Sequence, residues 1–176
     1  IYLSSGLRHF FPRGLLLSTL NVLCSIGGGG KSVILVDIMA DILFSDLNNH
    51  ILDSALLGDK APLILYVSRE LSESQVLARI LSTQGYDQDI LLTKTEEELE
   101  AIFFEHTKDS PFSLHIHCTE AKSEGYEDLK QMINEFEREG LKTIMVVDDY
   151  LDLAKYEPSA EDDKAKDAPI VTKARH

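Results

Sequence analysis

The sequence has few cysteines, no long apolar run and a shortage of basic residues. Cys24 and Cys118 are the two cysteines of the 176 residues, and each lies in a strand-like apolar run. We interpret both as buried, reduced thiols of an intracellular protein rather than as a disulfide. No apolar run approaches the roughly 18 residues of a membrane span, and no charged-then-apolar leader opens the chain. We therefore expect no membrane partner and a cytoplasmic location.

The shortage of basic residues bears on nucleic-acid binding. Lys and Arg number 17 against 30 Asp and Glu, which gives a formal net charge of −13. Because nucleic acid is a polyanion, this balance argues against a broad nucleic-acid-binding face on this part of the chain. It leaves room for local basic loops, or for a binding surface formed elsewhere.

Length and composition indicate one globular domain. The 176 residues, 44% hydrophobic and 27% charged, suffice for a single substantial core but not for two. We divide the chain into a lead-in over residues 1–14, a main domain over 15–153 and a polar, mobile tail over 154–176. Because the chain begins with Ile1 rather than Met, we interpret it as a fragment or a trimmed form of a longer protein.

The most informative stretch is glycine-rich and runs from Ser25 to Ser32, with the sequence Ser-Ile-Gly-Gly-Gly-Gly-Lys-Ser. An apolar run precedes it and a helical pattern follows, which is the setting of a phosphate-binding loop. In such a loop the glycines let backbone N–H groups turn toward the phosphates, and the helix N-terminus adds free donors and partial positive charge. The usual pattern begins with Gly where this chain has Ser25, so the alternative is a flexible glycine turn.

This loop supplies the predicted nucleotide-binding residues, which are Gly27, Gly28, Gly29, Gly30, Lys31 and Ser32. Lys31 is expected to reach the terminal phosphates of ATP and so to act in catalysis as well. The Ser32 hydroxyl is expected to ligate Mg²⁺. The sequence therefore predicts a protein that binds ATP with Mg²⁺.

Strand-like runs alternate with helical patterns along the chain. The strand-like runs are Leu15–Leu17, Leu20–Cys24, Leu63–Val67, Phe112–Cys118 and Thr143–Val147, the third and fifth being of the kind buried on both faces. Apolar residues three and four apart predict helices over Val33–Phe44, from Ser72 to Gly85, from Thr95 to His106 and over Ser123–Glu139. Ser72 and Thr95 each open a capping box, and residues 45–61 are expected to form a connection with an extra helical turn. This alternation predicts an α/β fold with a mainly parallel sheet flanked by helices.

Acidic residues follow two of these strands. Glu70 comes after the run at 63–67, and Asp148 and Asp149 end the run at 143–147. Ligands of parallel sheets bind at the carboxyl ends of the strands, where the glycine loop also lies. ATP hydrolysis needs a metal ion and a group that orients the attacking water. Either aspartate fits the metal role and Glu70 the water role, the alternatives being a solvated strand end and a surface acid at a helix start.

Three other features carry less chemistry. His115 and His117 share one face of a strand, but two aligned histidines without a second cluster favour a plain strand over a metal site. The acids from Glu96 to Glu100 are best interpreted as a solvated helix face. Arg69 could touch a phosphate or a neighbouring subunit, although a lone Arg more often pairs with an acid.

With these motifs the chain resembles the RecA-type ATPase domain of the DnaB-like replicative helicases, particularly the phage branch. Residues 19–32 resemble the first strand and phosphate loop of that family. Leu65–Ser72 is similar to its next motif, a strand ending in Ser-x-Glu-Met, and Glu70 falls on the catalytic glutamate. The order of the motifs favours this family over the related RadA and KaiC-like ATPases.

The third motif of the resemblance is the metal-site strand ending in Asp-Tyr-Leu, which Ile144–Leu151 resembles. Matching Asp-Tyr selects Asp149, whereas matching the end of the apolar run selects Asp148, and we favour Asp149. The resemblance covers roughly residues 14–153 and implies a RecA-like P-loop NTPase core, truncated in this chain.

The resemblance also implies a function and partners. It implies an ATP-hydrolysing motor domain of a replicative DNA helicase, working in a hexameric ring in which each site is completed by its neighbour. DNA contacts, the arginine finger and the domain that meets primase and other replisome proteins would lie outside this chain. A nucleotide-binding module that acts as an assembly switch is the alternative, and a small-molecule P-loop kinase is a weaker one.

Overall fold

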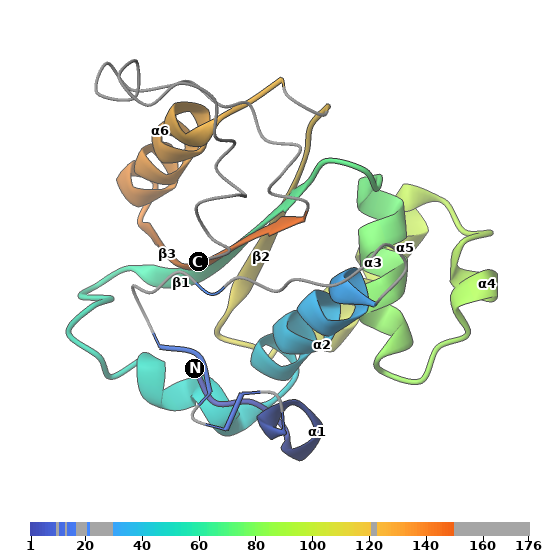
Figure 1. The fold of residues 1–176 in the computed structure, drawn as a ribbon, viewed down its shortest axis with the longest axis horizontal. Helices are drawn as coiled ribbons and strands as arrows, with labels where there is room; N and C mark the ends of the chain where they lie inside the picture. The colour runs from blue at the N-terminus through green and yellow to red at the C-terminus, as the bar shows by residue number, and fades with distance from the viewer. Residues whose placement is uncertain (10, 13, 17–20, 22–29, 121–122, 150–176) are drawn as a thin grey trace, which may run out of the picture.

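The computed structural model describes residues 1–9, 11–12, 14–16, 21, 30–120 and 123–149. A parallel sheet with helices on both faces forms the centre of this part of the chain (Figure 1). Its strands are β1 (Ala61–Ser68), β2 (Ser113–Cys118) and β3 (Leu141–Asp149), arranged in the order β2-β1-β3. Both neighbours pair parallel to β1, so the predicted α/β class with a parallel sheet is confirmed.

Helices connect and flank the strands. They are α1 (Ser5–Arg8), α2 (Lys31–Leu43), the 3₁₀ helix η1 (Asp46–Ile51), α3 (Glu73–Ser82), α4 (Gln88–Leu91), α5 (Glu96–Thr107) and α6 (Tyr126–Arg138). The four long helices and the extra helical turn within residues 45–61 match the sequence predictions. The described helices include none long and apolar enough to cross a membrane.

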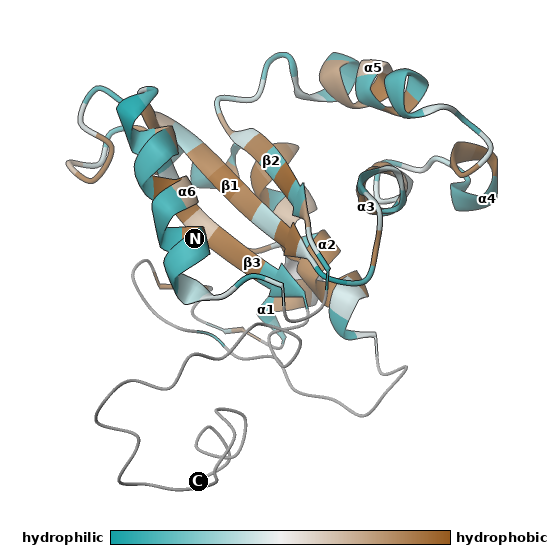
Figure 2. Cartoon of the chain, turned by 90° about the horizontal axis from the view of Figure 1, so that it is seen from above, coloured by the Kyte–Doolittle hydropathy of each residue, from teal (hydrophilic) through white to brown (hydrophobic). Residues whose placement is uncertain are grey.

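The two faces of the sheet are covered by different helices (Figure 2). On one face, Ile64 and Tyr66 of β1 join a buried core that includes apolar side chains of α2 and α3. On the other face, the ring of His115 in β2 packs against Phe136 of α6, with ring centroids 4.9 Å apart. Since successive residues of a strand point to opposite faces, this alternation assigns every strand residue to the α2 side or the α6 side.

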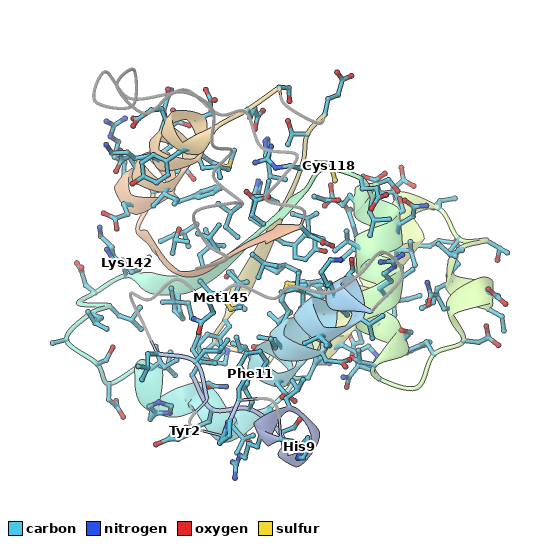
Figure 3. The ribbon with its side chains drawn as sticks, viewed as in Figure 1. Tyr2, His9, Phe11, Cys118, Lys142 and Met145 are labelled. Atoms are coloured by element: carbon cyan, nitrogen blue, oxygen red, sulfur yellow. The ribbon has the colours of Figure 1, made fainter. Side chains whose placement is uncertain are left out.

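Local signals explain where the helices begin and end. The capping boxes predicted at Ser72 and Thr95 are both present, each closing the first turn of its helix reciprocally. Gly140, with φ of 85°, follows α6 and turns the chain into β3. Figure 3 shows Lys142 at the start of β3 and Cys118 at the carboxyl end of β2, which mark opposite ends of the sheet.

Two expectations about strands were wrong. Residues 143–147 are not buried on both faces, since most of β3 is half-buried and Val146 is 41% exposed. The reason is that β3 pairs with β1 alone among the described residues and so lies at an edge. Leu15 and Leu16 lie in no strand, although Leu15 exchanges two backbone hydrogen bonds with Ile1. The predicted strand at 20–24, apart from Asn21, lies outside the described residues, as does the tail at 154–176.

The lead-in packs against α2 and carries the short helix α1. Leu3 and Leu7 are buried in the core that includes the apolar side of α2. The backbone N–H of Ser4 donates to Oδ2 of Asp41 at 2.7 Å, which ties the segment to α2. Asp41 lies in the last turn of α2, so this contact holds the end of the helix away from Lys31 and Ser32.

Candidate functional site

The predicted phosphate loop meets the described structure at the start of α2. Gly30 caps this helix with a left-handed backbone, φ of 77°, and Lys31 and Ser32 are its first residues. The first N–H groups of a helix have no intrahelical acceptor and can bind an anion. In both views the start of α2 lies at the same end of the sheet as the carboxyl ends of β1 and β3 (Figures 1 and 2). Gly27, Gly28 and Gly29 lie outside the described residues.

Asp149 ends β3 on the α2 side of the sheet. Its carboxylate is only 5% exposed, and its Oδ2 accepts a hydrogen bond of 2.8 Å from the hydroxyl of Tyr66, which is fully buried in β1. The backbone also links the ends of β1 and β3, because the Arg69 N–H donates to the Asp149 carbonyl oxygen at 3.0 Å. Within the described part of the chain, no Lys, Arg or His forms an ion pair with Asp149.

Asp148, one residue earlier, points to the α6 side and has a different environment. Arg69 binds its carboxylate with two hydrogen bonds, Nε to Oδ1 at 2.9 Å and Nη2 to Oδ2 at 3.1 Å. Arg69 is 5% exposed and also donates from Nη1 to the backbone oxygen of Glu124 at 3.2 Å. The Glu124 carboxylate in turn lies 2.6 Å from Nε2 of His117. The expectation that Arg69 pairs with an acid is therefore confirmed.

Glu70 lies in the tight turn between β1 and α3. The hydroxyl of Ser68 accepts from the Leu71 N–H at 2.9 Å and donates to the Leu71 carbonyl at 2.7 Å, so it pins both ends of that turn. The Thr119 N–H donates to the Ser68 carbonyl at 2.9 Å and ties the turn to the end of β2. Glu70 itself is exposed. The fold thus brings an accessible carboxylate and the two aspartates to the carboxyl ends of adjacent parallel strands.

Further carboxylates lie beside this edge, where α3 and α5 begin. Burial, together with Glu96 and Glu100, raises the pKa of the Glu73 carboxyl group. Partial desolvation also raises the pKa of the Cys118 thiol, although the residue is exposed, and Glu73 and Glu96 add to that effect. Cys118 is a free thiol at the exposed end of β2, so the expectation that it is buried was wrong. Cys24 lies outside the described residues.

Each of the two histidines of β2 contacts a side chain near α6. His115 packs on Phe136 and His117 pairs with Glu124, as a plain strand beside α6 would place them. Desolvation, and secondarily His117, lowers the pKa of His115. The described residues include no group of three or more His, Cys, Asp and Glu that could hold a metal ion. Mg²⁺ commonly binds one or two protein oxygens and completes its shell with phosphate oxygens and water, so it does not require such a group.

A sequence model of the divergent DnaB-like ATPase family matches residues 17–170. The chain belongs to this family. The match spans all three predicted motifs and confirms the resemblance inferred from them, and the parallel sheet flanked by helices is consistent with a RecA-like core. Membership of this DnaB-like family indicates a nucleotide-binding role. No curated protein is significantly similar in sequence to the chain.

Sequence reasoning missed one residue at this end of the sheet, Tyr66. Tyr66 was counted only as a strand residue, whereas Ser68 was noted as the serine of the Ser-x-Glu-Met resemblance, without its contacts to Leu71. A signal for Tyr66 was present, because a buried tyrosine in an otherwise aliphatic strand needs a hydrogen-bond partner for its hydroxyl. The acids at the neighbouring strand end were the obvious candidates for that partner.

Proposed function

We propose that this DnaB-like chain is the ATP-binding and ATP-hydrolysing motor domain of a replicative DNA helicase. In this proposal the phosphates of ATP bind the residues from Gly27 to Ser32, at the start of α2. Asp149 and Ser32 hold the Mg²⁺ ion, Asp149 through the water shell of the metal. Glu70 orients the attacking water.

The observation that carries the proposal is the environment of Asp149. A carboxylate that is 5% exposed, with no ion-pair partner among the described residues, is costly unless a cation or hydrogen bonds compensate it. Asp149 faces the side of the sheet that α2 covers, and the N-terminus of α2 lies at the same end (Figure 1). Asp148 faces the other side and is already compensated by Arg69. These environments favour Asp149 over Asp148 as the metal carboxylate.

The remaining roles rest on the chemistry of each side chain. Mg²⁺ offsets the charge that develops on the phosphates. Lys31 adds a cation at the first residue of α2, within reach of the terminal phosphates in loops of this kind. Glu70 is exposed in a turn that Ser68 holds rigid, which suits a carboxylate that must accept a proton from water.

The helicase part of the proposal concerns the assembly rather than this chain alone. We expect a hexameric ring, with DNA contacts and contacts to primase or other replisome proteins made by regions outside this chain. The net charge of −13 fits a portion that binds nucleotide and leaves DNA to other segments. Failure of DNA to stimulate hydrolysis in the hexamer would instead favour the assembly switch.

The first test is the binding of Mg²⁺–ATP, measured by calorimetry on the chain and on Lys31→Ala. Since a hydrogen bond to a charged group contributes about 1.5–3 kcal/mol, the variant should bind about 10- to 100-fold more weakly. Lys130→Ala is the matched control, because Lys130 pairs with Glu127 on the exposed surface of α6. Equal affinities in all three proteins would contradict the phosphate-loop assignment.

The second test separates binding from hydrolysis. Glu70→Gln should lower the ATPase rate by about 10²- to 10⁴-fold, the usual contribution of a general base, while ATP affinity is kept. Glu73→Gln is the control, since it neutralises a neighbouring carboxylate at the start of α3. The rates are best compared in the full-length hexamer with and without single-stranded DNA. A Glu70→Gln protein as active as the wild type would remove Glu70 from the mechanism.

A further inference from the structure

The hydrogen bond between Tyr66 and Asp149 joins two buried side chains on neighbouring strands. Tyr66 is fully buried, and its ring belongs to the core shared by the sheet, α2 and α3. In the register of the two strands Tyr66 lies beside Val147 and Ser68 lies beside Asp149. The tyrosine therefore reaches one step along the sheet to place its hydroxyl 2.8 Å from Oδ2 of Asp149.

The contact also restricts the orientation of the Asp149 carboxylate. An ionised carboxylate has two oxygens, and the tyrosine hydroxyl binds one of them, Oδ2. The last torsion of an aspartate is otherwise soft, with a broad range of orientations. A tyrosine ring locked in a core has little freedom, so its hydroxyl is a rigid anchor for that torsion.

We propose that Tyr66 is a positioning residue for metal binding: its hydroxyl holds the Asp149 carboxylate so that Oδ1 is presented to the water shell of Mg²⁺. The inference rests on the proposed function, in which Asp149 serves the metal. It adds a residue of β1 itself to a site to which the turn after β1 contributes Glu70. Tyr66 itself touches neither nucleotide nor metal in this proposal.

The Tyr66 hydroxyl has two opposing effects on Mg²⁺ affinity. Whether Tyr66→Phe weakens or strengthens Mg²⁺ binding therefore shows which effect is larger. Donation to Oδ2 draws charge away from the carboxylate, and this alone would weaken metal binding. Orientation acts the other way, and partners that orient metal-binding groups typically change metal affinity by about 10- to 100-fold. The inference requires that orientation dominate.

The experiment is a Mg²⁺ titration of nucleotide binding, using a fluorescent ATP analogue and the chain as described. Tyr66→Phe removes one oxygen atom and keeps the ring in the core. We expect the Mg²⁺ concentration for half-maximal binding to rise about 10-fold, while the affinity measured in EDTA stays unchanged. Tyr86→Phe is the matched control, because it removes a hydroxyl that contacts exposed His106 at 2.8 Å, away from the strand ends.

A second variant separates positioning from a general loss of stability. Asp149→Asn keeps an oxygen that accepts from Tyr66 but removes the charge that attracts the metal. If Tyr66 acts through Asp149, adding Tyr66→Phe to Asp149→Asn should change the Mg²⁺ dependence no further. Direct Mn²⁺ binding, followed by electron paramagnetic resonance with nucleotide present, should show the same pattern.

The outcomes distinguish this inference from the function on which it rests. An unchanged or lowered half-saturation for Mg²⁺ in Tyr66→Phe, with a normal response in the wild type, overturns the inference alone. An additional loss in the double variant also overturns it, since Tyr66 would then act independently of Asp149. A wild-type chain that binds nucleotide without regard to Mg²⁺, or not at all, overturns the proposed function and this inference together.

Discussion

Asp148 and Asp149 are neighbours in the sequence but differ in almost every physical respect. Asp148 faces α6 and is held by two hydrogen bonds from a buried arginine. Asp149 faces the core under α2 and is held by a neutral tyrosine hydroxyl. Strand alternation alone produces this difference, because a step of one residue crosses the sheet. The two faces at the same strand end therefore differ in charge compensation, and in our proposal only the face with Asp149 takes part in the chemistry.

The comparison shows why charge compensation is a better guide than the presence of an acid. On the α6 side, the fully buried guanidinium of Arg69 is neutralised by the carboxylate of Asp148. On the α2 side the carboxylate remains without a charged partner among the described residues, so the fold leaves it available to a cation. Stability and function should thus respond in opposite ways to the same substitution at the two positions.

The largest expected effect is the loss of stability in Asp148→Asn. The substitution leaves the buried guanidinium of Arg69 without its counter-charge, and breaking such a pair costs about 3–5 kcal/mol. Urea denaturation should show this loss as a lower midpoint. The Mg²⁺ dependence of nucleotide binding should stay that of the wild type.

The control for Asp148→Asn is the same substitution in an Arg69→Met background. With no buried guanidinium left, removing the carboxylate charge should cost much less, and the difference measures the coupling between the two side chains. A loss of the Mg²⁺ response in the single variant would reverse the assignment and make Asp148 the metal carboxylate.

Asp149→Asn should change the free energy of unfolding less than Asp148→Asn does, and in the opposite direction. It removes a buried charge that has no ion-pair partner in the described structure, while the amide oxygen can still accept from Tyr66. We expect the free energy of unfolding to hold or to rise by roughly 1 kcal/mol, the pattern seen where function is kept at the expense of stability. Thermal and urea denaturation without nucleotide check this, and a loss as large as that of Asp148→Asn would contradict it.

Much of this arrangement could be predicted from the sequence. The alternation of apolar runs and amphipathic helices predicted the parallel sheet, and the capping boxes at Ser72 and Thr95 located two helix starts to the residue. The convergence of Glu70 with the two aspartates followed from the rule that parallel strands present their carboxyl ends at one edge. Local patterns sufficed for these because each rests on a period or on a short-range hydrogen bond.

What could not be predicted depends on partners far apart in the chain. The pairing of Arg69 with Asp148 and of Tyr66 with Asp149 requires the register between β1 and β3, which includes an irregularity between Leu63 and Ile64. The exposure of β3 was misjudged for a related reason. The sequence shows that Thr143–Val147 is apolar. It does not show that this strand lies at the edge of the described sheet, because that depends on the order of the strands.

The smallest expected effect tests whether the two faces are independent. Glu124→Ala removes the carboxylate that contacts His117 but keeps the backbone oxygen that accepts from Arg69. Since both side chains are partly exposed, at 23% and 30%, the loss should be about 0.5–1 kcal/mol in urea denaturation. Glu127→Ala, which removes an exposed partner of Lys130, is the control and should change stability even less.

The Mg²⁺ response of Glu124→Ala is the more informative measurement. If the α6 side only holds the strand ends in place, the half-saturation for Mg²⁺ should equal that of the wild type. A shift would mean that movement of the loop around Glu124 reaches Asp149 through Arg69, whose N–H donates to the Asp149 carbonyl at 3.0 Å. Arg69 also binds the side chain of Asp148, the residue before Asp149, so it would carry such a movement from the α6 side to the end of β3.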